Sequence, residues 1–365
     1  DRDREAMTFR ARFSHAIIVM ASLSLSSRVS LQARFGSKAS RRVAASRGVR
    51  ASALPQKGRP ALTMVMRVPS AKESEVDALF ASHEAMMHAT HVIGEAEADD
   101  IGHPRMLEYY VAKSTELSDP LDAASSPTGN LLYAVTERYV DVIGVQEHMR
   151  IGTEKWSGFP KLIDFFEKYG CFAQPNGVQF TTFADSAEPC KTRKNDITLS
   201  LGITVPASKE KELDVLFASH ERFMRQTHAY GDYANPLHDD GKKPRLTHFS
   251  VNKAKELVDP FDATKGYTGK VQYSIAETYV SEKGIEGHFS FRESHPEVFQ
   301  GIIANFTNPD YARFADVGGG RVVAAQHSVD FASNIIGGVK KALDELLPRR
   351  APHEEFCEDY CPETW

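Results

Sequence analysis

The chain has 365 residues, of which 41% are hydrophobic and 25% charged, and its formal net charge is −5. This is the composition of an ordinary globular protein, long enough for two or three domains. Residues 1–72 hold 15 Lys/Arg against 3 Asp/Glu, so the remainder of the chain is acidic. An acidic remainder argues against nucleic-acid binding, which needs clustered cations. No run of residues is long and apolar enough for a membrane helix.

The N-terminal segment has the composition of an organelle-import sequence. No Asp or Glu lies between Ala6 and Lys72, and Arg, Ser and Ala dominate the segment. The apolar run AIIVMASLSL at 16–25 resembles a signal-peptide core, and the two parts together resemble the presequence of algae with complex plastids. We therefore expect a plastid protein in which residues 1–60 are a disordered presequence. A mitochondrial presequence and a basic tail of the working protein are the alternatives.

The rest of the chain contains an internal repeat. Between 68–91 and 205–228, 15 of 24 residues are identical, and between 104–144 and 244–284, 17 of 41 are identical. Two copies of this length are too few and too long for a solenoid. The chain therefore contains one domain twice.

The expected elements have the same order in both copies. A strand ending in Val-Pro precedes a helix with one apolar stripe, over about 73–90 and 210–227. Two strands rich in β-branched and aromatic residues follow, near 105–112 and 245–252 and then around the shared Glu and Tyr; a second helix and a last strand complete each copy. The order β-α-β-β-α-β is that of the ferredoxin-like split unit.

Such a unit has helices on only one face of its sheet, so its other apolar face needs a cover. Two units in one chain can press these faces together and close a barrel. We therefore expect an α+β fold in which two ferredoxin-like βαββαβ repeats form an intrachain dimeric α+β barrel. The repeats would span 64–186 and 197–330, and 331–365 would be a C-terminal helix and tail. The chain would be a monomer with an internal pseudo-dimer, or a higher oligomer of it.

Histidine and glutamate recur on the expected apolar faces. The first helix carries a histidine on its buried stripe, the third strand a glutamate among aromatic residues, and the second helix region another histidine. A histidine there can act as a base, and a carboxylate there is either paired or raised in pKa. The alternatives are a core histidine and a glutamate paired with a cation. The candidate catalytic residues are His83, Glu137, His148, His220, Glu277, His288 and His295.

The two copies differ after the second helix begins. His295 follows His288 by seven residues, whereas the first copy has Lys155 at that position. We therefore expect the second copy to hold the active pocket if only one is active. His91 and His228, at the ends of the first helices, could instead cap these helices as cations. The residues expected to contact the ligand are Phe217, Met224, His228, Tyr273, Tyr279 and Phe249.

Two familiar motifs are excluded. The stretch HEAMMHATH lacks the second histidine of an HExxH zinc motif, because Met87 stands four residues after His83. The stretch VGGGRV at 317–322 is a turn rather than a phosphate loop, since no GKS/T follows. We therefore expect no metal ion and no cofactor.

The stretch YSIAETYVSEKGIEGHFSFRESHPEVFQG at 273–301 resembles the antibiotic biosynthesis monooxygenase domain. The resemblance rests on a strand ending in Glu277, the aromatic Tyr279, and a helix with His288 and His295. The first copy keeps all but the last of these. The resemblance implies a dimeric α+β barrel. The activities of this family differ among its members. They include cofactor-free oxygenation of quinols and polyketides, haem degradation and isomerisation, and some members have no known reaction.

Two functions follow from this resemblance and from the residues. The first is cofactor-independent oxygenation of a quinol or another electron-rich aromatic, with His288 or His220 ionising the substrate and Glu277 orienting it. The second is a non-catalytic module that binds a pigment or another apolar ligand in an organelle; a structural remnant is the third possibility. The loops at 117–130 and 257–270 depart from the family's pattern and could cover the pocket.

Overall fold

The computed structural model describes residues 57–93, 103–122, 124–182, 192–230 and 243–326. The expected presequence and the expected C-terminal helix and tail lie outside these residues and stay predictions. Among the helices in these ranges, none combines the length and the apolar character that a membrane crossing requires.

The first half of the described chain contains eight main elements. Its strands and helices are β1 (Pro60–Pro69), α2 (Glu73–Thr90), β2 (Val92–Ile93), β3 (Arg105–Leu117), β4 (Pro127–Tyr139), α3 (Val142–Lys155), α4 (Phe159–Tyr169) and β5 (Gly170–Thr182). The expected order holds, with the short strand β2 added and the second helix divided into α3 and α4. The division follows from Pro160, which fits the first turn of α4 but not the interior of a longer helix.

The second half repeats this order element by element. Its strands and helices are β6 (Ile197–Pro206), α5 (Glu210–Thr227), β7 (Ala229–Tyr230), β8 (Arg245–Leu257), β9 (Tyr267–Tyr279), α6 (Glu282–Ser290), α7 (Pro296–Phe306) and β10 (Ala312–Gln326). Pro296 begins α7 just as a proline begins α4.

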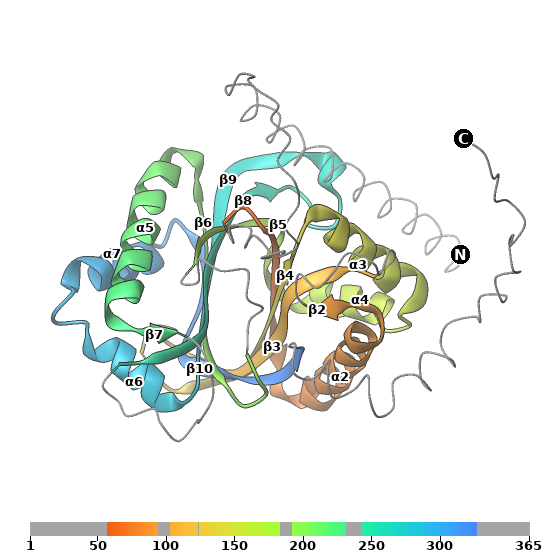
Figure 1. Ribbon diagram of the computed structural model, residues 1–365, viewed down its shortest axis with the longest axis horizontal. Helices are drawn as coiled ribbons and strands as arrows, with labels where there is room; N and C mark the ends of the chain where they lie inside the picture. Colours follow the sequence, from red (N-terminus) through yellow and green to blue (C-terminus); the bar gives the residue numbers. More distant parts are fainter. Residues whose placement is uncertain (1–56, 94–102, 123, 183–191, 231–242, 327–365) are drawn as a thin grey trace, which may run out of the picture.

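The long strands form one closed ring. Their order is β10-β6-β9-β8-β5-β1-β4-β3, and β10 also pairs with β3. The two halves join at two antiparallel seams, β5 with β8 and β10 with β3. Helices α2, α3 and α4 lie outside the ring on one side, and α5, α6 and α7 lie outside it on the other (Figure 1). The fold is therefore α+β, with a ring that resembles a dimeric α+β barrel.

Each first helix buries one stripe against the outer face of the ring. In α2 the stripe includes Val76, Phe80, His83 and Met87, and in α5 the equivalent residues are buried in the same way. The strands supply the facing side chains from every second position. This is why the histidine of the stripe is held beneath the helix and away from water.

The inner face of the ring differs from the expectation of an apolar surface, because many of its side chains are polar. Along β4, Arg138 lies on the opposite face from the helix-facing residues, and it approaches Glu108 of β3 at 3.6 Å. His248 Nδ1 of the second half lies 3.1 Å from Glu108 Oε2, and Ser274 Oγ donates to Gln174 Oε1 at 2.8 Å. The contacts of His248 and Ser274 join the two halves, and they give buried polar groups polar neighbours, which lowers the cost of burial.

Asp316 on β10 should make the stability of the fold depend on pH. Burial raises the pKa of its carboxyl to about 7, so between about pH 4 and pH 7 the folded chain holds a proton that the unfolded chain has lost. The contribution of Asp316 to the free energy of unfolding therefore falls as the pH rises through this range. Asp316→Asn should stabilise the protein by about 2–4 kcal/mol at pH 8 and by less at pH 5. Urea unfolding at both values tests this; an equal effect at both would contradict it.

Candidate functional site

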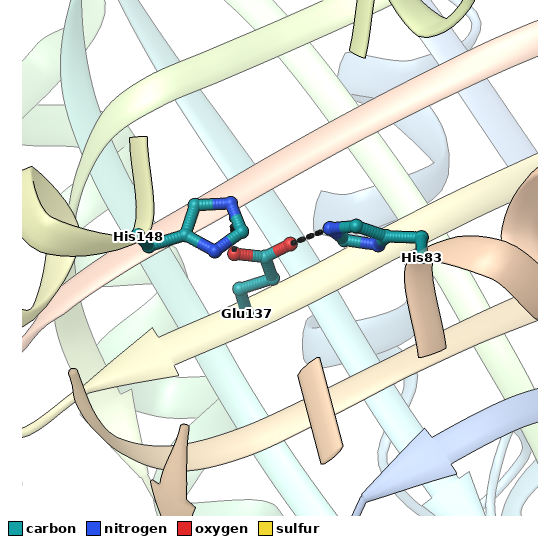
Figure 2. A group of neighbouring side chains, drawn as sticks. All are labelled: His83, Glu137 and His148. Atoms are coloured by element: carbon teal, nitrogen blue, oxygen red, sulfur yellow. Dashed lines mark ion pairs between the residues drawn. The ribbon is translucent and has the colours of Figure 1, made fainter. Parts of the chain in front are cut away.

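In the first half, three candidate residues meet between the helices and the ring. His83 comes from α2, Glu137 from β4 and His148 from α3, and the two imidazoles approach the carboxylate from opposite sides (Figure 2). His83 Nε2 lies 4.0 Å from Glu137 Oε1, and His148 Nε2 lies 3.5 Å from Glu137 Oε2. All three side chains are buried.

In the second half, the equivalent residues His220, Glu277 and His288 form the same kind of group. His220 Nε2 lies 3.2 Å from Glu277 Oε1, and His288 Nδ1 lies 3.6 Å from Glu277 Oε2. The hydroxyl of Tyr279 donates to Glu277 Oε2 at 2.7 Å. The sequence repeat and the strand register therefore bring together the residues that were expected to share a face.

The register explains why the two carboxylates are equivalent. The residues paired with them on the neighbouring strands are Leu62 and Tyr109 for Glu137, and Leu199 and Phe249 for Glu277. One of these partners differs in chemistry. Tyr109 places its hydroxyl 3.1 Å from His83 Nδ1, whereas Phe249 offers His220 only a ring edge. Among the described residues, His220 Nδ1 has no hydrogen-bond partner.

At pH 7 the second group combines an ionised Glu277 with a neutral His288. Burial alone would raise the pKa of Glu277, but His288, His220 and Tyr279 together hold it below its usual range. Burial lowers the pKa of His288 to about 4, against the opposing influence of Glu277. Burial also lowers the pKa of His228 to about 3. A carboxylate beside neutral imidazoles can stabilise positive charge on a histidine that accepts a proton.

His91 and His228 do stand at the C-caps of α2 and α5, but they are not cationic caps. Burial holds the pKa of both well below the usual histidine value. Each instead contacts the histidine of the neighbouring group: His91 Nε2 lies 3.0 Å from His148 Nδ1, and His228 Nε2 lies 3.2 Å from His288 Nδ1. They are therefore outer members of the two groups.

His295 does not join the second group. It forms the N-cap of α7 and is partly exposed. Its ring packs against the ring of Phe223, and its side chain forms a hydrogen bond with Ser294. The seven-residue spacing from His288 suggested one helix face, but the chain leaves the helix between α6 and α7. The spacing therefore does not carry His295 back to the carboxylate.

The cavities beside the two groups differ in size. The cavity beside Glu277 has a volume of about 350 Å³, and the cavity beside Glu137 has about 60 Å³. Trp156 fills part of the smaller cavity's wall, and the centroid of its ring lies 4.7 Å from that of His83. The second half therefore has the roomier pocket; the expectation that it is the active half stays a prediction.

The lining of the larger cavity corrects the expected ligand contacts. None of the residues expected to contact the ligand borders this cavity. They lie in the core or pack behind His220, Glu277 and His288. These residues are Phe217, Met224, His228, Tyr273, Tyr279 and Phe249. The lining residues that sequence reasoning missed include Phe289, Arg292, Val298, Phe299 and Ile302 from α6, α7 and the turn between them. The apolar stripe of the stretch PEVFQGIIANF could have indicated that this helix lines the cavity.

Each half covers the cavity of the other. Leu121 and Asp122, from the loop after β3, border the second-half cavity, and Pro260 and Phe261, from the loop after β8, border the first-half cavity. The seams explain the crossing, because β3 and β8 pair with strands of the opposite half. The loops therefore do cover pockets, but not those of their own repeat.

Phe261→Ala should show that this crossing stabilises the fold. The Phe261 ring packs edge-on against Phe166 of α4, with 5.3 Å between ring centroids. Because Phe261 is only partly buried, its truncation should cost about 1–3 kcal/mol, less than a fully buried phenylalanine. Chemical denaturation would measure the loss. A change within error would mean that the loop is not held by this contact.

Comparison with known proteins gives likeness of fold only. No known family model matches the chain, and no curated protein matches its sequence. Among solved structures, a candidate monooxygenase from Fusobacterium nucleatum is 10% identical, with a TM-score of 0.40 over 74% of this chain and 95% of that one. An anthrone oxidase-like protein is 10% identical (TM-score 0.41, 74% and 94%), and a candidate monooxygenase from Lactobacillus acidophilus is 9% identical (0.38, 74% and 97%). Likeness at this level says nothing about activity.

Proposed function

We propose that the second-half pocket binds a small aromatic hydroxy compound and removes a proton from it, so that the resulting anion reacts with O2. One observation carries this proposal. His220 is buried at the wall of a cavity of about 350 Å³, its Nε2 lies 3.2 Å from Oε1 of the ionised Glu277, and neither of its ring nitrogens has a hydrogen-bond partner among the described residues. This is the arrangement of a general base with its orienting carboxylate.

The shape and lining of the cavity favour an apolar ring. Its volume falls at the lower end of the range typical of small-molecule pockets. Leu199, Leu201 and Ile275 line it from the strands, and the polar group His220, Glu277 and His288 borders the same cavity. An aromatic compound with one hydroxyl directed at His220 fits an apolar wall beside this group.

The reaction needs no external reductant. His220 accepts the hydroxyl proton, and Glu277 stabilises the imidazolium that forms. The ring anion gives one electron to O2, and the two radicals join in a C–O bond at the ring carbon para to the hydroxyl. The peroxide anion takes the proton back from His220, and the resulting hydroperoxide loses water, using the hydrogen on that carbon, to leave a carbonyl. One substrate and one O2 thereby become one quinone and one water.

An oxygen electrode tests this with paired substrates. We expect the full chain to consume O2 with 1-naphthol or with anthrol, the hydroxy tautomer of anthrone, to release the corresponding quinone, and to do neither with a naphthol methylated on the para carbon. Such an analogue can ionise but has no hydrogen there to lose as water. Tight retention of these compounds without O2 uptake would overturn the oxygenase proposal and favour the binding module instead.

A further inference from the structure

We propose that His83, Glu137 and His148 form a site for one divalent transition-metal ion, with Zn²⁺ as the simplest occupant. The proposal concerns the first-half group and is independent of the reaction proposed for the second. Two imidazoles and one carboxylate are a ligand set found in zinc sites with an open position and in non-haem iron sites. The HExxH exclusion is unaffected, because these ligands come from three separate elements.

The spacing of the three side chains suits an ion between them. Their candidate ligand atoms all lie within 4.8 Å of one another. The distances from Glu137 to His83 and to His148, 4.0 and 3.5 Å, are too long for good hydrogen bonds. Two ligands at about 2.0–2.2 Å from a tetrahedral ion lie roughly 3.4 Å apart. The carboxylate and imidazoles are therefore close to the separation that a shared ion would impose.

A chain of hydrogen bonds assigns the free nitrogen of His148. The Thr90 hydroxyl donates to Met86 O at 2.7 Å, so it accepts from His91 Nδ1 at 2.8 Å. Because Nδ1 of a neutral His91 then carries the ring proton, its Nε2 is unprotonated and accepts from His148 Nδ1 at 3.0 Å. In a neutral His148, Nε2 then carries the lone pair, and this is the nitrogen that faces Glu137 (Figure 2).

Each of the three side chains is also held from outside. His83 Nδ1 contacts the Tyr109 hydroxyl, His148 Nδ1 contacts His91, and the Tyr139 hydroxyl donates to Glu137. Outer partners of this kind fix the tautomer and orientation of metal-binding histidines. The imidazole nitrogens and carboxylate oxygens on the inner side face one another. Lone pairs on these atoms repel each other unless a proton or a metal ion lies between them.

The second-half group lacks two of these features. His288 presents the same nitrogen, Nδ1, to both Glu277 and His228, so that nitrogen is already engaged. His220 has Phe249 where His83 has a tyrosine hydroxyl. The first-half cavity, at about 60 Å³, holds roughly four waters and so has room for an ion but not for an aromatic substrate.

Metal content distinguishes the two groups. The full chain is stripped with a chelator, dialysed against Co²⁺ or Zn²⁺, and analysed by elemental analysis and, for Co²⁺, by visible absorption. We expect one equivalent per chain and a rise in melting temperature on adding Zn²⁺. Glu137→Gln and His148→Ala should lose that equivalent and the thermal shift. The matched variants Glu277→Gln and His288→Ala should keep both.

A variant outside the ligand set keeps the test decisive if a ligand variant fails to fold. Tyr109→Phe should retain the fold and weaken Zn²⁺ binding about 10- to 100-fold, as loss of an outer partner does. The proposal is overturned if the stripped chain takes up no Co²⁺ or Zn²⁺, if folded Glu137→Gln binds as the parent does, or if Glu277→Gln alone removes the ion.

Discussion

Replacing His220 by Ala should lower O2-dependent turnover of 1-naphthol by roughly 10²–10⁴-fold, the usual contribution of a general base. Glu277→Gln should cause a loss of similar size, because it removes the charge that stabilises the protonated imidazole while keeping the shape of the side chain. Initial rates of O2 uptake across substrate concentration give kcat/KM for each variant. Circular dichroism confirms that each variant remains folded.

Two further variants separate a chemical role from a structural one. Phe249→Tyr places a hydroxyl where the first half has Tyr109 beside its histidine, so it should occupy His220 and lower turnover. His295→Ala should leave turnover unchanged, because this residue caps α7 and packs on Phe223 instead of approaching Glu277. A folded His220→Ala protein that keeps the parent rate, or a His295→Ala protein that loses it, would refute this assignment.

The repeat made most of the fold predictable. Two related stretches, each with the order of a split βαββαβ unit, imply two sheets with one helix-covered face each, and closure of the ring follows from covering the other faces. The same logic placed Glu137 and Glu277, because period two on a strand and 3.6 on a helix put a glutamate of one element opposite a histidine of another. His83 and His220 are buried beneath their helices as this pattern predicts.

The shape of the pockets was not predictable, because it arises from contacts between halves. No local pattern in the first repeat indicates that Leu121 borders the second cavity, or that Phe261 borders the first. The expected ligand contacts failed for a related reason. Residues such as Phe217 are so thoroughly buried that they form the core, and the cavity lies beyond them, against α7.

The sequence pattern of the strands did indicate a polar inner face, although an apolar face was expected. Thr136 and Arg138 alternate with the helix-facing residues of β4, as Ser274 and Thr278 do on β9. Alternation of this kind means two faces of different character. What it cannot show is that the second face is buried too, which requires the partner sheet.

Acidification from pH 7 to about 4.5 should destabilise the protein, because His288 and His228 together lower the free energy of unfolding by several kcal/mol and Asp316 offsets only part of this. Burial lowers the pKa of His288 to about 4 and that of His228 to about 3, whereas an unfolded histidine titrates near 6.5. Below pH 6.5 these two histidines therefore bind protons in the unfolded chain but not in the folded chain. Their effect is that the free energy of unfolding falls with falling pH. Each histidine contributes at most about 1.4 kcal/mol per pH unit.

Urea unfolding at pH 7, 6 and 5 measures this slope, and two variants assign it. A double variant, His228→Asn with His288→Gln, should flatten the dependence because its side chains do not titrate in this range. Asp316→Asn should steepen it, since the raised pKa of Asp316 favours the folded chain as the pH falls and so opposes the histidines. A slope that neither variant changes would mean that the groups around Glu277 and inside the ring do not control acid stability.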